Sequence, residues 1–406
     1  MSKVVIIGGG ASGLMAAYSA SRNKNNTVIL LEKNGECGKK LNICGKGRGN
    51  ITNIADTKDF ILAFGQNGKF LYSVFSQFSN NDLINLLNEN GLQTIVERGG
   101  RVFPKSEIAR DVTALFINQI KDVVNIKYGV QASGLFALDN IIKGVKVKGG
   151  IIKCDKVIIA TGGKSYPKTG STGDGYTFAK SVGHNISKIS PSICPILCYD
   201  EWIKEVAGLS LKNVELSFYC KDKLIKSEFG EMLFTHTGIS GPIVLTVSKY
   251  ISEIEDYKNI NLSLDLKPAL SRGDLYKKLT NEFKSNIIIK NYFNTILPKS
   301  LAKIFPQLCN LNPDKKVNII TKEEKYQIID SIKKLSFSFK SLAPIEEAIV
   351  TKGGVDIKEI NPKTMESKIV KGLYFCGECI DIDAKTGGYN LQAAFSTGYV
   401  AGKLAE

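Results

Sequence analysis

The sequence lacks several features that would assign it to a protein class at once. No uninterrupted apolar run approaches the roughly 20 residues that a membrane helix needs. Nine cysteines, an odd number at irregular spacing, do not resemble a disulfide framework, so we expect reduced thiols. The first residues, MSKVVIIGGG, lack all three features of a secretory signal: a basic region, a long apolar segment and a cleavage site. These absences together predict a cytoplasmic protein without a membrane span.

Positive charge is in excess but is not concentrated in the sequence. The chain has 54 Lys and Arg against 39 Asp and Glu, a net charge of +15. Such an excess is typical of proteins that meet nucleic acid, an acidic membrane surface or a polyanionic cofactor. No dense basic block occurs, and the lysines are spread through a chain rich in Ile and Asn. The scattered charge therefore makes nucleic acid a less favoured partner, which stays open as an alternative. It does not indicate the oligomeric state.

A dinucleotide-binding pattern opens the chain. Residues 3–7 form an apolar strand, GGGASG follows, and a predicted helix leads to a second strand that ends in Glu32. Gly8, Gly10 and Gly13 fill the G-x-G-x-x-G pattern, and the acid follows about 20 residues later, as a Rossmann unit requires. We expect the helix start to face a pyrophosphate and Glu32 to accept hydrogen bonds from ribose hydroxyls. The pattern alone leaves FAD and a nicotinamide nucleotide open.

A glycine-rich loop with cations and no acid follows at residues 38–53, GKKLNICGKGRGNITN. Such a loop suits a long ligand that has two phosphates and further polar groups; the alternative is a solvated basic loop. Arg48, with its fixed fork of donors, and Asn50 and Asn53, with their amides, are the best candidates for ligand contact.

The middle of the chain repeats the strand-to-glycine pattern once. Residues 154–163, CDKVIIATGG, run into glycines, and Thr172, Gly173 and Asp174 open another predicted helix. Asp174 is typical of a helix cap, which we favour over a catalytic acid. No second G-x-G-x-x-G follows a strand, so the sequence does not predict a separate nicotinamide-binding domain.

Residues 191–345 change character and are predicted to be an insertion. Short alternating stretches predict a β-rich part over 191–266 and 333–345, and a helical part over 267–332. The insertion contains His236, one of only two histidines, in the polar, glycine-containing stretch LFTHTGISGP. A lone histidine is more often structural than catalytic, but this setting keeps a proton-donor role open.

The strand, glycine and helix pattern returns after the insertion, in KGLYFCGE and TGGYN followed by LQAAFSTGYVAGKLA. Residues 1–190 and 346–406 are therefore predicted to form one cofactor-binding domain, with one ligand site built from both ends of the chain. The start of the last helix can offer backbone N–H groups to a carbonyl that gains negative charge, as the flavin C2 carbonyl does on reduction.

These stretches resemble the two-dinucleotide-binding-domain flavoproteins, and most closely the BaiN-like (YhiN) family of FAD-dependent oxidoreductases. The matching stretches are GGGASG, GKKLNICGKGRGNITN, GRVFPKS, ATGGKSYPKTGSTGDGY, FTHTGISGP, NPKTMESK, GLYFCGE and TGGYNLQ. The resemblance implies an α/β fold, with a Rossmann-like FAD-binding domain of the glutathione-reductase type and an inserted β-barrel-like and helical region. It also implies that Glu32 binds the adenosine ribose, and that Glu378, Gly387 and Gly388 meet the flavin and its ribityl chain.

Motifs and resemblance together predict a set of cofactor contacts. These are Gly8, Gly10, Ala11, Ser12, Gly13, Glu32, Lys33, Lys40, Arg48, Asn50, Thr161, Gly162, Gly163, Thr172, Gly173, Asp174, Gly377, Glu378, Gly387, Gly388, Tyr389 and Asn390. One position departs from the family, whose members commonly have a cysteine where this chain has Gly49, so a role of that thiol is absent or displaced to Cys44.

Cys376 and Cys379, on either side of Glu378, are predicted to be small apolar fillers, with a redox pair as the alternative. A zinc site is disfavoured because no second Cys/His pair with suitable spacing occurs.

The function that we predict from the sequence is an FAD-dependent oxidoreductase. NAD(P)H would bind transiently and reduce the flavin, which would then reduce a small unsaturated or carbonyl acceptor, or oxygen. Two alternatives stay open: an FAD-containing RNA-binding or tRNA-modifying protein, which would use the positive charge, and a flavin-bound scaffold or sensor without turnover.

Overall fold

The computed structural model describes residues 2–254 and 256–404 of the chain. These residues fold into two compact units. The first is formed by residues 1–192 and 345–406, and the second by residues 193–344.

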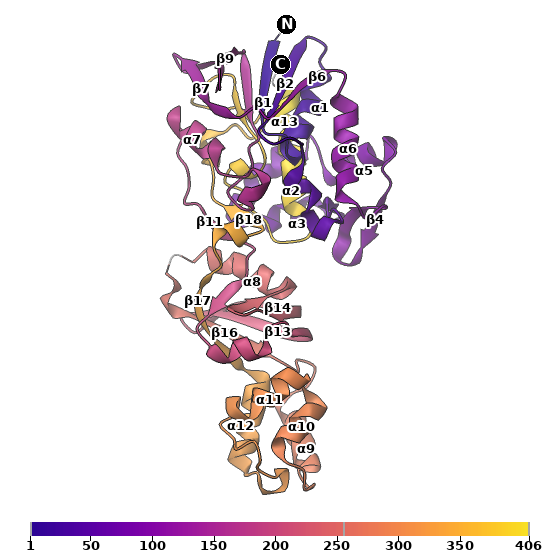
Figure 1. Ribbon diagram of the computed structural model, residues 1–406, viewed down its shortest axis with the longest axis vertical. Coiled ribbons are helices and arrows are strands. Elements are labelled where there is room, and N and C mark those ends of the chain that lie inside the picture. The colour runs from indigo at the N-terminus through magenta and orange to yellow at the C-terminus, as the bar shows by residue number, and fades with distance from the viewer. Residues whose placement is uncertain (1, 255, 405–406) are drawn as a thin grey trace. The chain divides into compact units, whose positions relative to one another are not determined.

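A parallel five-stranded sheet lies at the centre of the first unit (Figure 1). Its order is β19-β10-β1-β2-β6 and all neighbouring strands are parallel. The strands are β1 (Ser2–Ile7), β2 (Asn26–Glu32), β6 (Val124–Tyr128), β10 (Lys156–Ile159) and β19 (Leu373–Phe375). Continuous apolar runs such as Val4–Ile7 are buried, as expected for parallel strands that are covered on both faces.

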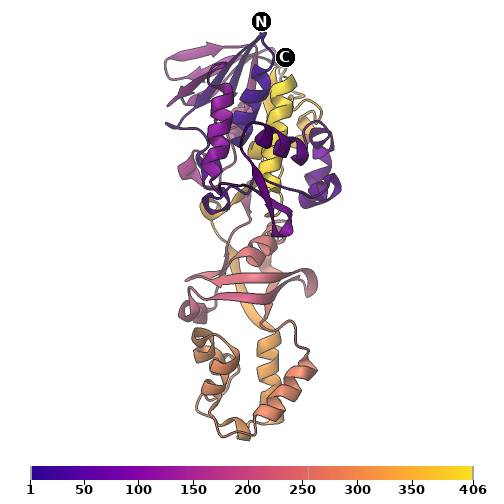
Figure 2. The same ribbon diagram turned by 90° about the vertical axis from the view of Figure 1, so that its right-hand side faces the viewer.

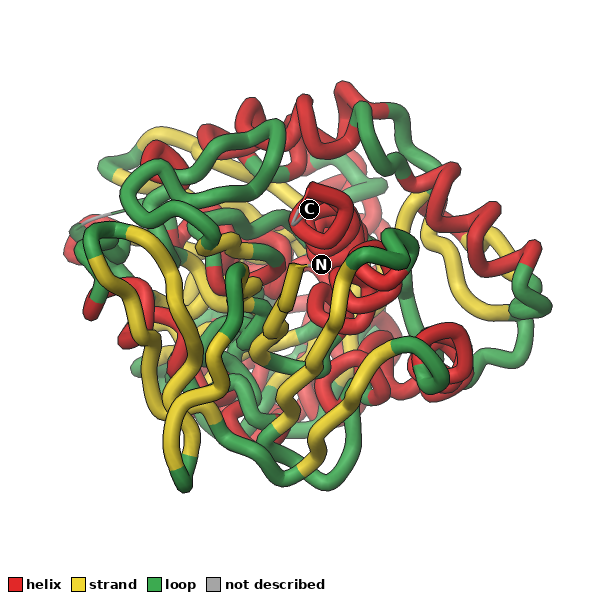
Figure 3. The backbone as a smooth tube through the Cα atoms, turned by 90° about the horizontal axis from the view of Figure 1, so that it is seen from above, coloured by secondary structure: helices red, strands yellow, loops and turns green. Residues whose placement is uncertain are grey.

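Two helices from opposite ends of the chain pack side by side against this sheet, α1 (Ala11–Ser21) and α13 (Tyr389–Leu404) (Figure 3). Glycines on α13 allow their close approach. A Cβ atom at Gly398 would lie 2.3 Å from the Ser12 carbonyl oxygen, and one at Gly402 would lie 2.4 Å from that of Ala16. The N-terminal and C-terminal segments are therefore parts of one core.

Smaller elements complete the first unit. An antiparallel three-stranded sheet contains β7 (Ala132–Leu138), β8 (Ile141–Val147) and β9 (Gly150–Lys153). A second contains β3 (Thr52–Asn53), β5 (Arg101–Pro104) and β4 (Thr94–Glu97). The helices are α2 (Lys39–Asn42), α3 (Thr57–Ala63), α4 (Tyr72–Phe75), α5 (Asn80–Glu89), α6 (Ala109–Ile120) and α7 (Asp174–Ser181).

Two short strands, β11 (Ser190–Ser192) and β18 (Val350–Lys352), form an antiparallel pair where the chain leaves the first unit and returns to it.

The second unit contains a closed six-stranded barrel and a helical part (Figure 2). The barrel order is β12-β15-β14-β13-β16-β17, with β12 (Ile196–Cys198), β13 (Ser210–Cys220), β14 (Lys223–Phe234), β15 (Gly238–Ser240), β16 (Ile260–Asp265) and β17 (Leu335–Leu342). Helix α8 (Pro242–Ser252) packs on β14. The helical part contains α9 (Arg272–Glu282), α10 (Ile289–Ile296), α11 (Lys299–Leu308) and α12 (Lys322–Lys333).

The fold class predicted from the sequence is confirmed: a Rossmann-type domain with a parallel sheet is combined with an inserted barrel and helices. Among the helices of residues 2–254 and 256–404, we find none with the length and apolar character of a membrane span.

Candidate cofactor site

The three glycines of the first motif have different reasons to be glycine. A Cβ atom at Gly13 would lie 1.8 Å from the Gly8 carbonyl oxygen, so the start of α1 packs directly on the turn. Gly8 has a φ of +105°, and a Cβ there would lie 2.5 Å from the Ala160 oxygen. At Gly10, by contrast, no atom beyond Gly10 and its two chain neighbours lies within 4 Å of where a Cβ would be. Packing explains Gly8 and Gly13, whereas open space for a ligand explains Gly10.

The start of α1 is open to an anion. Gly10 is its N-cap, no side chain caps the helix, and its first turn contains no acidic residue. The first N–H groups of a helix lack intrahelical partners and carry partial positive charge, which suits phosphate oxygens. Ala11 and Ser12 occupy this first turn, and Gly377 lies beside it, since a Cβ there would be 2.4 Å from Ser12 Oγ.

Glu32 is held at the carboxyl end of β2, next to the glycine turn. Its Oε2 accepts a hydrogen bond from Gly9 N at 2.8 Å, and its Oε1 accepts one from Asn34 N at 2.8 Å. The side chain is buried, with the residue 6% exposed. The backbone thus fixes a carboxylate at Gly9, which directly precedes Gly10, and a Rossmann unit meets ribose hydroxyls with an acid at the end of this strand.

Lys33 lies in a second cluster, with Thr172 and Asp174. Lys33 Nζ donates to Thr172 Oγ1 at 2.6 Å and to Asp174 Oδ2 at 2.8 Å, and Thr172 Oγ1 donates to Asp174 Oδ1 at 2.9 Å. Asp174 is the first residue of α7, and Gly173 is its N-cap. These contacts support the structural interpretation of Asp174 and tie α7 to the end of β2.

The loop after β10 contains an unsatisfied hydroxyl. Thr161 Oγ1 is buried and has no hydrogen-bond partner among the described residues. Gly162 and Gly163 follow, and a Cβ at Gly163 would lie 2.4 Å from Thr351 Oγ1 and 2.9 Å from Glu378 Oε1. An unpaired buried hydroxyl costs free energy, so a bound ligand that supplies the missing partner would stabilise this loop.

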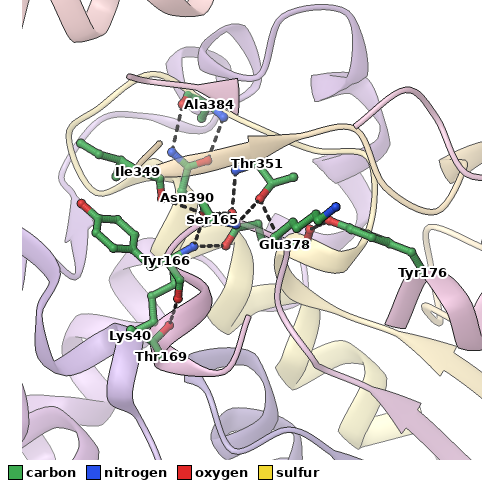
Figure 4. Close-up of polar contacts among 11 residues, drawn as sticks. Lys40, Ser165, Tyr166, Thr169, Tyr176, Ile349, Thr351, Glu378, Ala384 and Asn390 are labelled. Atoms are coloured by element: carbon green, nitrogen blue, oxygen red, sulfur yellow. Dashed lines mark hydrogen bonds and ion pairs between the residues drawn. The ribbon is translucent and has the colours of Figure 1, made fainter. Parts of the chain in front are cut away.

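Glu378 is the centre of a hydrogen-bond network that joins four segments of the first unit (Figure 4). Lys40 Nζ donates to its Oε2 at 2.6 Å. Its Oε1 accepts from Thr351 N at 2.7 Å and from Ser165 Oγ at 3.0 Å. Thr351 Oγ1 in turn accepts from the backbone N of Ser165, at 3.0 Å. The carboxylate is therefore fixed in position and stays partly exposed, with 19% of the side chain accessible.

The glycines before α13 are held by the two asparagines of the loop at residues 38–53. Asn53 Nδ2 donates to the Gly387 oxygen at 3.0 Å. In the orientation that satisfies both ends of its amide, Asn50 accepts from Gly388 N at 3.1 Å. Gly388 has a φ of +96°, and a Cβ there would lie 2.2 Å from the Thr52 oxygen. The loop and the start of α13 therefore form one assembly.

Tyr389 and Asn390 direct their side chains into the protein. The Tyr389 ring is buried and meets Phe60 edge-on, with 4.8 Å between ring centroids. Asn390 bonds both backbone polar groups of Ala384, at 2.8 and 2.9 Å (Figure 4). A ligand would thus meet the backbone at the start of α13, while these side chains support the turn.

Arg48 is paired within the protein. Its guanidinium bonds Glu97 and Glu107 and lies over the Phe103 ring, with 4.5 Å from Cζ to the centroid. The Arg48 hydrogen bond holds the pKa of Glu97 below its usual value. Arg48 Nε is buried and lacks a partner among the described residues, and Gly49 follows with its backbone against Ala109. Arg48 therefore joins the predicted cofactor loop to β4 and to the turn at Glu107.

Cys376 and Cys379 are buried free thiols. Cys379 Sγ lies 3.4 Å from the Ile159 oxygen and 3.2 Å from that of Cys376. Burial raises the pKa of Cys379 to about 12 and raises that of Cys376 well above its usual value. Cys44, the other candidate thiol, also has its pKa raised to about 12, mainly by burial. Because the thiolate is the reactive form, these environments favour inert thiols over a redox pair.

Sequence reasoning missed four polar residues next to the predicted site. Ser165 and Thr351 bond Glu378, and Asp381 and Asp383 lie in the loop between Glu378 and Gly387. Ser192 Oγ donates to Asp383 Oδ2 at 2.7 Å, and burial is the main cause that raises the pKa of Asp381. The repeated acid in IDIDA was the available signal for the last two, whereas nothing in the sequence connects Thr351 with Glu378.

His236 belongs to the second unit. It is exposed in the turn between β14 and β15, which is closed by a hydrogen bond from Thr235 N to the Gly238 oxygen at 2.8 Å. In the part of the chain that the structure describes, no three His, Cys, Asp or Glu side chains are arranged to hold a metal ion.

Comparison with known proteins agrees with this architecture. The family model described as "HI0933-like protein Rossmann domain" matches residues 2–404. The chain belongs to this family. It is the BaiN-like (YhiN) flavoprotein family that the motifs predicted, and that prediction is confirmed.

Named relatives of this HI0933-like chain fall into two groups. It is 30% identical to the 3-dehydro-bile acid delta(4,6)-reductase of Clostridium scindens, over all of this chain and 99% of that protein. It is also 30% identical to the ribosomal RNA dihydrouridine synthase of Haemophilus influenzae, over 98% of this chain and 97% of that protein. The corresponding synthase of Escherichia coli is 29% identical, over 97% and 96%.

Two solved structures share the fold of the HI0933-like chain at low identity. Quinol fumarate reductase of E. coli aligns with a TM-score of 0.53 at 15% identity, over 100% of this chain and 69% of that one. The 3-ketosteroid delta1-dehydrogenase of Sterolibacterium denitrificans aligns with a TM-score of 0.51 at 11% identity, over 99% of both chains.

Proposed function

We propose that the protein is an FAD-dependent oxidoreductase that NAD(P)H reduces and that passes the reducing equivalents to a carbon–carbon double bond conjugated with a carbonyl. The observation that carries the FAD assignment is the open space at Gly10, which lies directly before an uncapped helix. Glu32 is held next to this turn by Gly9 N. The Glu378 network, which comes from the other end of the chain, belongs to the same unit. A long dinucleotide with a pyrophosphate, a ribose and a ribityl chain matches this order of groups.

The residues of the first unit would hold the cofactor in three places. The N–H groups at the start of α1 would bind the pyrophosphate, and Glu32 would accept hydrogen bonds from the adenosine ribose. Glu378, fixed by Lys40 and Thr351, would orient the ribityl hydroxyls. The backbone before α13 would donate to the flavin pyrimidine edge, where negative charge develops on reduction.

Held in these three places, FAD would supply the hydride chemistry that links NAD(P)H to an electron-poor carbon of the acceptor. The acceptor carbon next to the carbonyl must then gain a proton. His236 is our candidate for the donor, because it is an exposed imidazole in a polar turn. NAD(P)H would bind only transiently, since the sequence has one G-x-G-x-x-G pattern after a strand.

Both groups of relatives support the acceptor class. The bile acid reductase is named for the reduction of ring double bonds, and dihydrouridine is uridine with its 5,6 double bond reduced. In each acceptor the double bond is conjugated with a carbonyl, so hydride addition and protonation give a saturated product. A small molecule is our first candidate acceptor, and a uracil base in RNA is the second, because two of the named relatives are ribosomal RNA enzymes.

The test starts with the purified protein. We expect it to be yellow, to release FAD on heating, and to lose the flavin absorbance when NADH or NADPH is added without oxygen. Each reduced sample is then mixed with a conjugated enone steroid or with a uridine-containing RNA, and reoxidation of the flavin is followed. Release of FMN, or of no flavin, would refute the cofactor assignment; a flavin that NAD(P)H does not reduce would refute the reaction.

A further inference from the structure

The helical part of the second unit has a surface seam where α9 and α12 pack against each other. Arg272 of α9 is ion-paired with Asp330 of α12. One turn further along each helix, the rings of Tyr276 and Tyr326 stack, with 5.2 Å between centroids and 23° between planes. The two helices are therefore antiparallel, and residues four apart on each form successive rungs.

The next rung places Thr280 opposite Lys322, by the same spacing of four residues. We define the α9–α12 seam as Tyr276, Thr280, Lys322, Lys325 and Tyr326. Lys325 belongs to it because it follows Lys322 by three residues and therefore lies on the same face of α12.

The tyrosine pair of the seam lies at the surface. Tyr326 is 44% exposed and Tyr276 is half-buried, whereas the core of the helical part is formed by other rings, such as Phe293 and Phe305. A stacked pair at the surface leaves an aromatic face or edge available to a further flat group.

Positive charge is concentrated in this part of the second unit. Residues 267–332 contain 12 Lys and Arg against six Asp and Glu, a net charge of +6. The remainder of the unit, residues 193–266 and 333–344, contains 10 against 11, a net charge of −1. The helical part is thus the basic half of the unit.

The acids of the helical part are already engaged. Asp330, Asp314 and Glu324 are ion-paired with lysine or arginine. Asp274 caps α9, Glu282 accepts from Tyr292, and Glu323 is held by Thr321 at the start of α12. Nine lysines form no ion pair with a described carboxylate: Lys267, Lys277, Lys278, Lys284, Lys299, Lys303, Lys316, Lys322 and Lys325. The charge of these lysines is therefore available to a partner.

We infer that the α9–α12 seam binds single-stranded nucleic acid. Phosphates would pair with Lys322 and Lys325, and a base would stack on the exposed Tyr326 ring, which is the combination that single-strand binding surfaces use. An acidic protein segment would need the lysines but would gain nothing from the rings. This inference rests on the second candidate acceptor of the proposed function, a uracil base in RNA. RNA binding to the seam can nevertheless be measured without running the flavin reaction.

The experiment measures binding of a fluorescently labelled oligouridine RNA to the intact, FAD-loaded protein by anisotropy at several salt concentrations. Tyr326→Ala should weaken binding about 5- to 150-fold, since stacking contributes on the order of 1–3 kcal/mol per base. Tyr326→Phe keeps the ring and should stay within about 3-fold of the parent. The double change Lys322→Ala with Lys325→Ala should lower the slope of log affinity against log salt by about 1.4, because each phosphate contact contributes about 0.7.

The matched control removes two exposed lysines of the first unit, Lys146→Ala with Lys148→Ala, and should leave affinity and slope unchanged. FAD content, which none of these changes should affect, is measured for each variant. An equal loss of RNA affinity in the control variant would overturn the proposal, because it would show that net charge alone binds RNA. Binding unchanged by Tyr326→Ala would also overturn it, as would displacement of the RNA by an equally charged polyglutamate peptide.

The two hypotheses fail separately. A protein that retains and reduces FAD but shows no seam-dependent RNA binding contradicts only the seam, and one that binds RNA without flavin contradicts only the proposed function.

Discussion

The two units present their chemistry in different ways. In the first unit, the candidate cofactor site consists of backbone N–H groups, glycines with no room for a side chain, and carboxylates held by several hydrogen bonds, as at Glu378. In the second unit, the candidate groups are side chains at the surface: His236 in a turn of the barrel, and the tyrosines and lysines of the α9–α12 seam on a pair of helices. Changes in the first unit should therefore affect retention of FAD, and changes in the second should affect turnover or partner binding with FAD retained.

The largest effect is expected at His236. If it protonates the acceptor, His236→Ala should slow flavin reoxidation by the acceptor by a factor on the order of 10² to 10⁴, while FAD content stays at that of the parent. Stopped-flow absorbance after reduction with NAD(P)H measures this rate. Thr237→Ala, at the next exposed position of the same turn, is the control. Reoxidation at the rate of the parent would return His236 to a structural role.

Gly10→Val tests the opposite side of the comparison. No protein atom would clash with a Cβ there, so the variant should fold and yet lose FAD affinity by on the order of 10²-fold, because the side chain occupies the space of the pyrophosphate. Flavin content after gel filtration and thermal unfolding of the apoprotein report the two effects separately. Gly273→Val, on α9, is the control, since a Cβ at Gly273 would meet only Ser271 Oγ, at an ordinary contact distance of 3.7 Å. A folded Gly10→Val protein with one FAD per chain would contradict the assignment.

Glu378→Ala should have an intermediate effect. It removes a charge-assisted contact to the ribityl chain, worth roughly 1.5–3 kcal/mol, which corresponds to about 10- to 150-fold weaker FAD binding. It also leaves Lys40 and Thr351 N without their acceptor. Glu378→Gln preserves volume and one acceptor oxygen and should lose less. Titration of the apoprotein with FAD measures both, and equal affinities of the alanine variant and the parent would exclude Glu378 from the site.

The smallest effect is expected for Cys376→Ser combined with Cys379→Ala. FAD content and reduction by NAD(P)H should stay within a few-fold of the parent, and anaerobic titration should consume about two electrons per flavin. The pKa of Cys379 is raised to about 12, so at pH 8 the folded protein holds it as the thiol, and iodoacetamide should label it only after denaturation. Uptake of about four electrons, falling to two in the double variant, would identify a redox pair.

The parts of the first unit that were predictable are those that depend on local pattern. The strand, glycine turn, helix and acid from Lys3 to Glu32 follow from spacing alone, because each residue acts on neighbours close in sequence. The alternating stretches of the barrel were predictable for the same reason: β13 from Val214 to Phe218, and β16, have buried apolar residues at every second position.

The partners of the polar groups were not predictable. Nothing local indicates that the Arg48 guanidinium meets Glu97 and Glu107, or that Thr351 N reaches Glu378, because these pairs form only when distant segments meet. The cofactor roles proposed for Arg48 and Asp174 stay predictions, and both residues have protein partners that account for their charge. Counting charge over residues 267–332 finds the basic half of the second unit, but the ion pairs that engage three of its acids form only in the folded helices.

The pairing of Lys40 with Glu378, which lie 338 residues apart in the chain, has a consequence for the biogenesis of the protein. Strand β18, edge strand β19 and helix α13 all follow residues 193–344 in the chain, so a ribosome that has made the Gly8 turn and Glu32 still has the whole inserted unit to synthesise. Contacts of such long sequence separation form late and slowly. Until β19 has been synthesised, the apolar strand β10 has one edge unpaired and is exposed to chaperones and proteases. Capture of the cofactor would then mark the end of folding, and FAD supply would determine how much newly made chain survives.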